Sequence, residues 1–260
     1  MRNTLRYLLL LLTIIYLCSC RDKSKIDRFA LVTRHNIENS LIDSLNSLSV
    51  GNGEFAFTVD ITGLQTFPEF YSKGISLGTM SDWGWHTGEN PENFQLRDVY
   101  KTYDVHGRKV DYVRQFRANE DARKAEASDW LRSNPHRIHL GMIGLQILKE
   151  DGTEISISDV RDPVQKLNLW TGEIDSRFIV EEEPVHLKTI CHPDYDMISV
   201  KVISGLIGKN RLKIKINFPL GVSSPNGYDF NSPDKHTTRI LADTNNLTIF
   251  SRSQDSDKYN

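Results

Sequence analysis

Cysteine is scarce in this chain of 260 residues. Three cysteines are present, and two of them, Cys18 and Cys20, lie within the first twenty residues. If Cys20 becomes a modified N-terminus, Cys191 has no partner, which excludes a disulfide framework. Zinc sites need three or four convergent ligands, and His192-Pro193-Asp194 beside Cys191 has no second ligand pair. We therefore expect no metal site and read this segment as a turn.

The chain also lacks an excess of positive charge. It carries 32 Lys and Arg residues against 34 Asp and Glu residues, a formal net charge of −2. Nucleic-acid binding requires clustered positive charge, so we expect no nucleic-acid partner. No sequence feature points to a cofactor, and we expect none. Charged residues at 25% and aromatic residues at 9% are typical of a folded globular chain.

The N-terminus has the pattern of an export signal. Arg2 and Arg6 form a basic start, and Tyr7–Leu17 is an almost unbroken apolar run. This run is shorter than the about 20 residues that a membrane-spanning helix needs, and it fits the apolar region of a signal peptide. Leu17-Cys18-Ser19 before Cys20 resembles a bacterial lipobox. We predict a lipoprotein signal peptide at residues 1–19, lipidation of Cys20 and anchoring in the bacterial cell envelope, periplasmic or surface-facing; the alternative is an ordinary signal peptide with a chance cysteine.

Short runs with β-strand periodicity dominate the rest of the chain, after a tether at residues 20–33. Glu54–Asp60 places Phe55, Phe57 and Val59 on one face, the period of a half-buried strand. Turn residues His106-Gly107 and Asp151-Gly152 indicate hairpins. Further strands are expected at Ile174–Val180, Val185–Ile190, Met197–Ile203, Leu212–Phe218 and Leu247–Phe250.

One segment has a clear helical pattern, Glu120–Arg132, with Asn119 available as its N-cap and Pro135 after its end. Many short strands and little helix predict an all-β fold, an antiparallel β-sandwich or supersandwich with one short helix. We assign this domain to residues 34–260. Because the chain stops soon after the strand at Leu247–Phe250, we expect the domain to be truncated at its C-terminus.

The polar and aromatic cluster Asp82-Trp83-Gly84-Trp85-His86 is the strongest candidate for a binding site. Flat indole rings pack against the C–H faces of sugars, and imidazole and carboxylate groups bond their hydroxyl groups. Trp83, Trp85 and His86 are therefore the predicted carbohydrate-binding residues. The alternative, about equally favoured by the sequence, is that both tryptophans fill the end of the sandwich core.

Three other patterns carry weaker implications. Gly74-Ile75-Ser76-Leu77-Gly78 matches the nucleophile pattern of esterases, but the required strand–turn–helix context is missing. Glu181-Glu182-Glu183 is most simply a solvated hairpin turn. His136 and His139 are three residues apart in a strand-like run, so we expect them on opposite faces.

Several segments together resemble the start of family-65-like glycoside hydrolases, over about residues 34–260. They are Arg34-His35-Asn36, Leu48–Phe57 (LSVGNGEFAF), Thr62–Phe67 (TGLQTF), Trp83-Gly84-Trp85-His86, Trp130-Leu131-Arg132, Asn134-Pro135-His136-Arg137, Leu169–Ile174 (LWTGEI) and His192-Pro193-Asp194. The resemblance implies an N-terminal β-supersandwich that is normally joined to an (α/α)6 barrel. The barrel carries the family's general acid, and this chain has no all-helical second half, so no catalytic residue is assigned.

The resemblance therefore implies a non-catalytic domain, a fragment or split half, of a glycoside-hydrolase-like carbohydrate-active lipoprotein that is inactive alone. Its expected partners are carbohydrate, the membrane through the N-terminal lipid, and a separate (α/α)6-barrel polypeptide. The alternative is a stand-alone glycan-binding envelope lipoprotein. The sequence leaves the sugar, its linkage and the choice of hydrolysis or phosphorolysis open.

Overall fold

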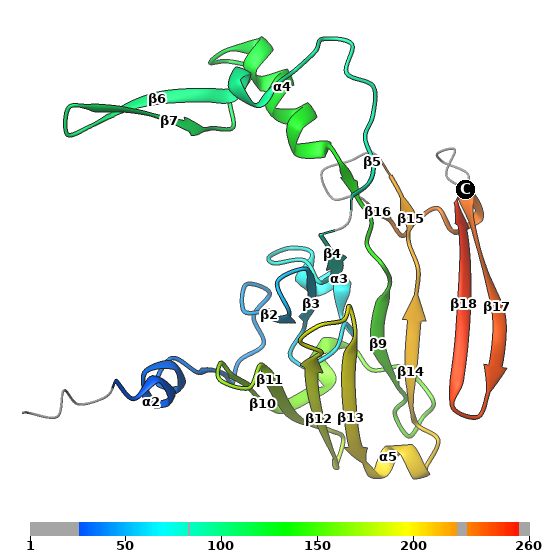
Figure 1. Cartoon of the computed structure of the whole chain (residues 1–260). Helices are drawn as coiled ribbons and strands as arrows, with labels where there is room; N and C mark the ends of the chain where they lie inside the picture. The colour runs from blue at the N-terminus through cyan, green and yellow to red at the C-terminus, as the bar shows by residue number, and fades with distance from the viewer. Residues whose placement is uncertain (1–25, 83, 223–227, 255–260) are drawn as a thin grey trace, which may run out of the picture.

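The computed structural model describes residues 26–82, 84–222 and 228–254, with the backbone alone at residues 84–86, 136 and 254. The described chain is mainly β, and its paired strands are antiparallel. The predicted all-β, sandwich-like fold class is confirmed. The chain forms a packed body from which two long hairpins project (Figure 1). The predicted signal peptide and Cys20 lie outside the described residues.

One layer of the body is a five-stranded sheet. Its strands, in spatial order, are β1 (Ile37–Asn39), β10 (Val160–Asn168), β11 (Glu173–Val180), β12 (Glu183–Cys191) and β13 (Ile198–Ser204). Buried and less buried residues alternate along β11 and β12, as expected when one face of a sheet meets a core. The register pairs Phe178 with Val185 and Ile174 with Thr189, and all four side chains are buried.

The facing layer contains a three-stranded sheet and a separate strand pair. The strands are β2 (Leu48–Gly51), β3 (Phe55–Val59), β4 (Gly78–Ser81), β9 (Met142–Ile147) and β14 (Leu212–Asn217). Phe55, Phe57 and Val59 are buried on one face of β3, which confirms the predicted strand at Glu54–Asp60. A single apolar cluster joins these strands to β10, β11 and β12, so the two layers share one core.

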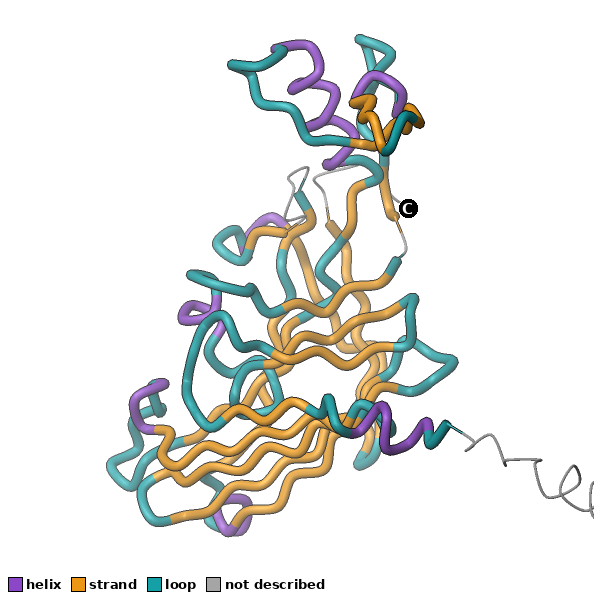
Figure 2. Tube along the Cα trace, turned by 90° about the vertical axis from the view of Figure 1, so that its left-hand side faces the viewer, coloured by secondary structure: helices purple, strands orange, loops and turns teal. Residues whose placement is uncertain are grey.

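An arm leaves the body through β5 (Gly84–His86) and returns through β8 (His136–Arg137), which pair with each other. The arm contains η1 (Leu96–Val99), β6 (Tyr100–Val105), β7 (Arg108–Val113) and α4 (Ala122–Ser133). Figure 2 shows it standing clear of the stacked strands of the body. It has a small core of its own, made of Phe94, Val99 and Ala127 with Phe116, Trp130 and Leu131 against them.

Helix α4 confirms the predicted helix but begins two residues later than expected. Its N-cap is Asp121, whose side chain accepts a hydrogen bond of 3.0 Å from the Lys124 N–H. The predicted N-cap, Asn119, is therefore wrong. Glu120 lies in a turn before the helix, where its carboxylate pairs with Arg114 and its N–H bonds the Arg117 carbonyl. These contacts use Glu120 outside the helix and leave Asp121 to cap it.

The remaining elements are short, except for a second long hairpin. The helical elements are α2 (Arg28–Thr33), α3 (Pro68–Tyr71), α5 (Gly205–Gly208), η2 (Ile157–Asp159) and η3 (Pro233–Lys235), so further short helices accompany the predicted one, and α2 lies within the predicted tether. The remaining strands are β15 (Leu220–Gly221), β16 (Tyr228–Asp229), β17 (His236–Thr244) and β18 (Leu247–Gln254). Across residues 26–82, 84–222 and 228–254, no helix has the length and apolar character to cross a membrane.

Candidate functional site

The structure gives the backbone around the predicted carbohydrate-binding residues. Trp83 lies outside the described residues, and for Trp85 and His86 the backbone alone is described, as part of β5. In the register of β5 and β8, Gly84 lies opposite Arg137, and His86 lies opposite His136. The strand β5 thus lies at the point where the arm joins the body. Whether the tryptophans bind a ligand or fill the core stays a prediction.

A cleft of about 560 Å³ lies directly beside this segment. It is lined by Ser49, Val50, Gly51, Gly53, Glu54, Phe55, Ala56, Met80, Ser81, Asp82 and Arg137, from β2, β3, β4 and the start of the arm. Three charged side chains, Glu54, Asp82 and Arg137, are exposed here. Carboxylates accept and guanidinium groups donate hydrogen bonds, so this set matches the mixed demands of ligand hydroxyl groups.

The wall of the cleft that precedes Trp83 is held by hydrogen bonds. The Asp82 N–H donates to the Glu54 carbonyl at 2.6 Å. The Arg137 guanidinium donates through Nη1 to the Asp82 carbonyl at 2.7 Å and to the Ser81 carbonyl at 3.3 Å. These bonds tie the chain before Trp83 to β3 on one side and to β8 on the other. These hydrogen bonds therefore fix the backbone position of Ser81 and Asp82, the residues that come directly before Trp83.

Sequence reasoning missed two of the three charged residues in the cleft. Asp82 belongs to the predicted cluster Asp82–His86, but the sequence does not indicate that Glu54 and Arg137 lie near that cluster. The turn Gly51-Asn52-Gly53 places Glu54 at the start of β3, and Arg137 comes opposite Gly84 through the pairing of β5 with β8. No local sequence pattern predicts these contacts, because Glu54 and Arg137 are 28 and 55 positions away from Asp82 in the chain.

Ser76 does not lie on a nucleophile elbow. It is exposed in a loop between the short helix α3 and the strand β4, the reverse of the strand–turn–helix order that esterases use. Ser76 does line a cavity of about 430 Å³, together with Pro68, Glu69, Ser72, Leu77, Met142, Asn217, Tyr228, Phe230 and Asn231. No histidine is among the described residues that line this cavity, so Ser76 has no histidine base there.

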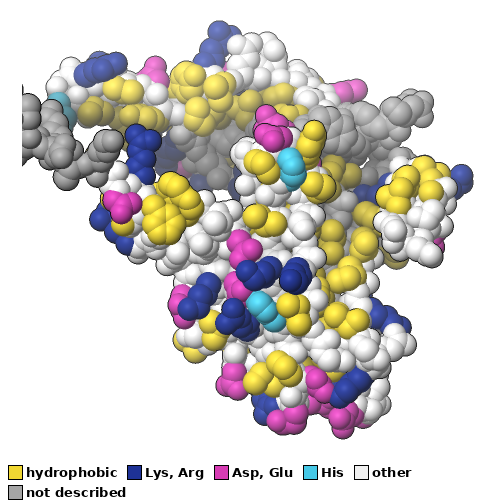
Figure 3. Space-filling view, turned by 60° about the horizontal axis from the view of Figure 1, so that its bottom comes forward, with side chains coloured by type: hydrophobic (Ala, Val, Ile, Leu, Met, Phe, Trp, Pro, Cys, Tyr) yellow, Lys and Arg dark blue, Asp and Glu magenta, His cyan; other side chains and the backbone are white. Residues whose placement is uncertain are grey.

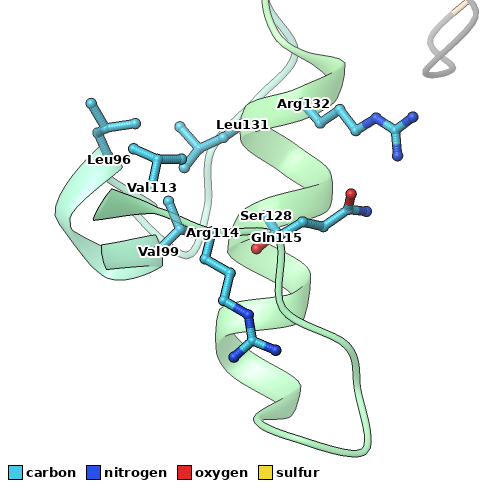
Figure 4. A pocket seen from close by; sticks show the side chains of 8 residues that line it. All are labelled: Leu96, Val99, Val113, Arg114, Gln115, Ser128, Leu131 and Arg132. Carbon is cyan, nitrogen blue, oxygen red and sulfur yellow. The ribbon is translucent and has the colours of Figure 1, made fainter. Parts of the chain in front are cut away.

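A third cavity, of about 270 Å³, lies in the arm. Figure 4 shows Leu96, Val99, Val113 and Leu131 turned toward one another between η1, the end of β7 and α4, while the long side chains of Arg114 and Arg132 extend away. The mainly apolar wall offers few groups for a hydroxylated ligand. The cleft beside β5 is therefore the better candidate for a carbohydrate.

Asp60 forms a buried polar centre next to the core and has a structural role. Its Oδ1 accepts from the Thr62 N–H at 2.8 Å and from the Thr62 hydroxyl at 2.5 Å. Its Oδ2 accepts from the Thr66 N–H at 2.6 Å and from the Phe67 N–H at 2.8 Å. Burial raises the pKa of Asp60 to about 6, against the lowering effect of these bonds. The carboxylate thus organises the loop Thr62–Phe67 and is closed to any ligand.

Two of the patterns singled out in the sequence, His192-Pro193-Asp194 and Glu181-Glu182-Glu183, lie at connections between strands. The Asp194 N–H donates to His192 Nδ1 at 3.0 Å in the connection after β12, in agreement with the predicted turn. Glu181 and Glu183 are not simply solvated, because they pair with Arg211 and Lys209. Throughout the described part of the chain, no three His, Cys, Asp or Glu side chains gather as a metal site would require.

Comparison with protein-family models and with curated protein sequences finds no match for this chain.

Proposed function

We propose that this chain is the non-catalytic, carbohydrate-binding domain of a glycoside-hydrolase-like envelope lipoprotein. The observation that supports the proposal is the cleft of about 560 Å³ beside the segment Trp83–His86. Its exposed charged groups Glu54, Asp82 and Arg137 offer both acceptors and donors of hydrogen bonds to the hydroxyl groups of a sugar. Sites of this kind combine apolar surface with a few placed polar groups.

The expected affinity of the isolated domain is low. Stacking on one indole ring contributes about 1 kcal/mol, and a hydrogen bond from His86 contributes a similar amount. After the cost of association, these contacts give dissociation constants in about the millimolar range. A barrel polypeptide that closes the cleft would add contacts and raise the affinity.

The test is to measure oligosaccharide binding and thermal stability of the mature chain and of single variants. We expect Trp83→Ala and Trp85→Ala each to weaken binding about fivefold or more, from the loss of about 1 kcal/mol of stacking. Trp170→Ala is the matched control, since Trp170 lies in the turn between β10 and β11 and is not among the residues that line the cleft.

Two outcomes would contradict this role. In the first, the variants retain full oligosaccharide binding. In the second, Trp85→Ala lowers the unfolding free energy by several kcal/mol with no specific effect on binding, as loss of a large core side chain does.

The alternative is a stand-alone glycan-binding lipoprotein, and the observation that favours it is the single apolar core that the two layers of the body share. The two proposals differ in their partners. Affinity purification of the lipid-anchored protein from its own membranes, followed by mass spectrometry, would recover an all-helical barrel polypeptide in the first case. In the second case, glycan binding would persist in the purified chain without it.

A further inference from the structure

Large apolar side chains are exposed together at the N-terminal end of the body. Phe29 in α2 is 54% exposed, and Trp170 in the turn between β10 and β11 is 50% exposed. Their rings meet edge to face at a centroid distance of 5.4 Å. Ile26, three residues before Phe29, and Leu169, next to Trp170, are 74% and 41% exposed. Contiguous apolar surface of this kind marks contact with a partner or a membrane.

The turn that carries Trp170 is held by hydrogen bonds. Asn168 Oδ1 accepts from the Trp170 N–H at 2.9 Å, and the Leu169 N–H donates to Asn36 Oδ1 at 2.9 Å. The Gly172 N–H bonds the Asn168 carbonyl at 2.8 Å. The indole is thus presented from a defined turn beside the short strand β1. Figure 3 shows hydrophobic side chains gathered at the left, where α2 lies, with Lys and Arg side chains and also acidic side chains around them.

The charge of the same region is positive. Residues 21–34 contain five basic and two acidic side chains, a net charge of +3 in a chain whose total is −2. Arg28 and Arg34, at the two ends of α2, are exposed, and neither forms an ion pair within the described chain. Exposed tryptophan beside arginine is typical of a surface that meets anionic headgroups, where indole rings settle at the membrane interface.

The distance to the predicted lipid anchor limits what can cover this surface. Cys20 lies six residues before Ile26. Six fully extended residues span at most about 20 Å, so an acylated Cys20 holds Ile26 within that distance of the bilayer. Phe29, the member of the exposed aromatic pair that lies in α2, follows three residues after Ile26.

We propose that this α2 face, made of Ile26, Phe29, Leu169 and Trp170, lies on the lipid bilayer that anchors the chain. The apolar side chains enter the headgroup region, and Arg28 and Arg34 face anionic headgroups. The inference rests on the anchoring part of the proposed function and is independent of carbohydrate binding. It makes the domain a body with a fixed orientation on the membrane, instead of one swinging on a free tether.

The experiment uses the lipid-anchored protein reconstituted into vesicles of phosphatidylethanolamine and phosphatidylglycerol, with and without brominated acyl chains. Bromine quenches indole fluorescence at contact, so we expect brominated lipid to quench part of the tryptophan emission. Trp170→Phe should abolish the quenched part. The matched control is Trp130→Phe, because Trp130 lies in the arm with its Nε1 bonded to the Glu89 carbonyl at 3.0 Å, and this variant should keep the quenching. Arg28→Gln with Arg34→Gln should reduce it.

Several results would overturn the proposal. One is an acylated protein, confirmed by mass, whose emission brominated lipid does not quench. Another is quenching that survives Trp170→Phe. A third is equal shielding of Trp170 from solvent when no lipid is present, together with dimers in sedimentation. That result would assign the face to a second copy of the chain.

If mass spectrometry shows no acyl group, flotation of the chain with anionic vesicles becomes the test of the α2 face. A chain without an acyl group that does not float with these vesicles would overturn the proposal. A chain that does not bind glycan counts against the proposed carbohydrate site. It has no bearing on the fluorescence quenching by brominated lipid.

Discussion

Two hairpins of this molecule use the same local design and end in opposite surroundings. β6 and β7 are joined by His106-Gly107, and β11 and β12 by Glu181-Glu182, so both connections have two residues. The first residue of each connection has positive φ, 54° at His106 and 53° at Glu181. Along β11 and β12 one face is buried in the core, whereas β6 and β7 are exposed on both faces, with one half-buried position.

The comparison shows that pairing and burial are separate contributions to a strand. In the arm hairpin, Tyr103 and Tyr112 meet edge to face at 5.9 Å, and Lys101 lies 5.3 Å above the Tyr103 ring. The contact of Tyr103 with Tyr112 joins the two strands, and cross-strand contacts of this kind contribute up to about 1 kcal/mol each. In the body hairpin, Phe178 and Val185 are almost fully buried. There, removal of apolar surface from water supplies most of the stability.

The largest expected difference concerns two aromatic residues that each lie opposite a valine. Phe178 pairs with Val185 in the body, and Tyr103 pairs with Val110 in the arm. Phe178→Ala should lower the unfolding free energy by about 3–5 kcal/mol, because it leaves a cavity in the core. Tyr103→Ala should cost less than about 1 kcal/mol. Urea unfolding of both variants measures the two losses. Equal losses of unfolding free energy would show that the arm contributes as much to the stability of the chain as the body does.

A smaller difference is expected between two glycines with positive φ. Gly63 has φ 88°, and a Cβ there would lie 2.7 Å from Ser176 Oγ. Gly107 has φ 82° and nothing within 4 Å of the same position. The left-handed backbone costs a non-glycine residue about 1–2 kcal/mol in both places, and Gly63→Ala adds a buried steric clash. We expect a loss of about 3 kcal/mol for Gly63→Ala and about 1 kcal/mol for Gly107→Ala in thermal unfolding. Similar losses would contradict the tight packing around Ser176.

The third comparison concerns pH and a buried histidine of the body. His139 is 0% exposed, its Nδ1 accepts from the Gly141 N–H at 3.2 Å, and its ring meets the edges of Tyr228 and Phe230. Burial lowers the pKa of His139 from 6.5 to about 4, although the Leu77 backbone acts in the opposite direction. Its stabilising contribution is therefore complete above pH 6.5 and declines as the pH falls toward 4.

At pH 5 this decline amounts to about 2 kcal/mol relative to pH 8. His139→Gln removes the titration, so the difference in unfolding free energy between pH 8 and pH 5 should shrink by about that amount relative to the unmodified chain. The comparison of slopes cancels the contribution of Asp60, which both proteins share. Parallel stability curves for the two proteins would show that His139 titrates in the folded state as it does in water.

The candidate site divides in the same way as the hairpins. The sequence indicated the cluster from Asp82 to His86, because tryptophans beside a carboxylate and an imidazole have a recognisable chemistry. Glu54 and Arg137 join it through strand pairing and through a hydrogen bond from the Asp82 N–H. The exposed pair of Phe29 and Trp170 likewise joins two segments far apart in the chain.

The sequence by itself determined the local structure of this protein. Alternating residues in β3, turn residues at His106-Gly107, and the helix pattern before Pro135 act over a few neighbouring positions, so their outcome can be read directly from the chain. Only the tertiary structure decided which strands are covered, that Asp60 is buried, and which charged groups line the cleft. Burial depends on a second layer supplied by distant segments, and no local pattern records whether that layer is present.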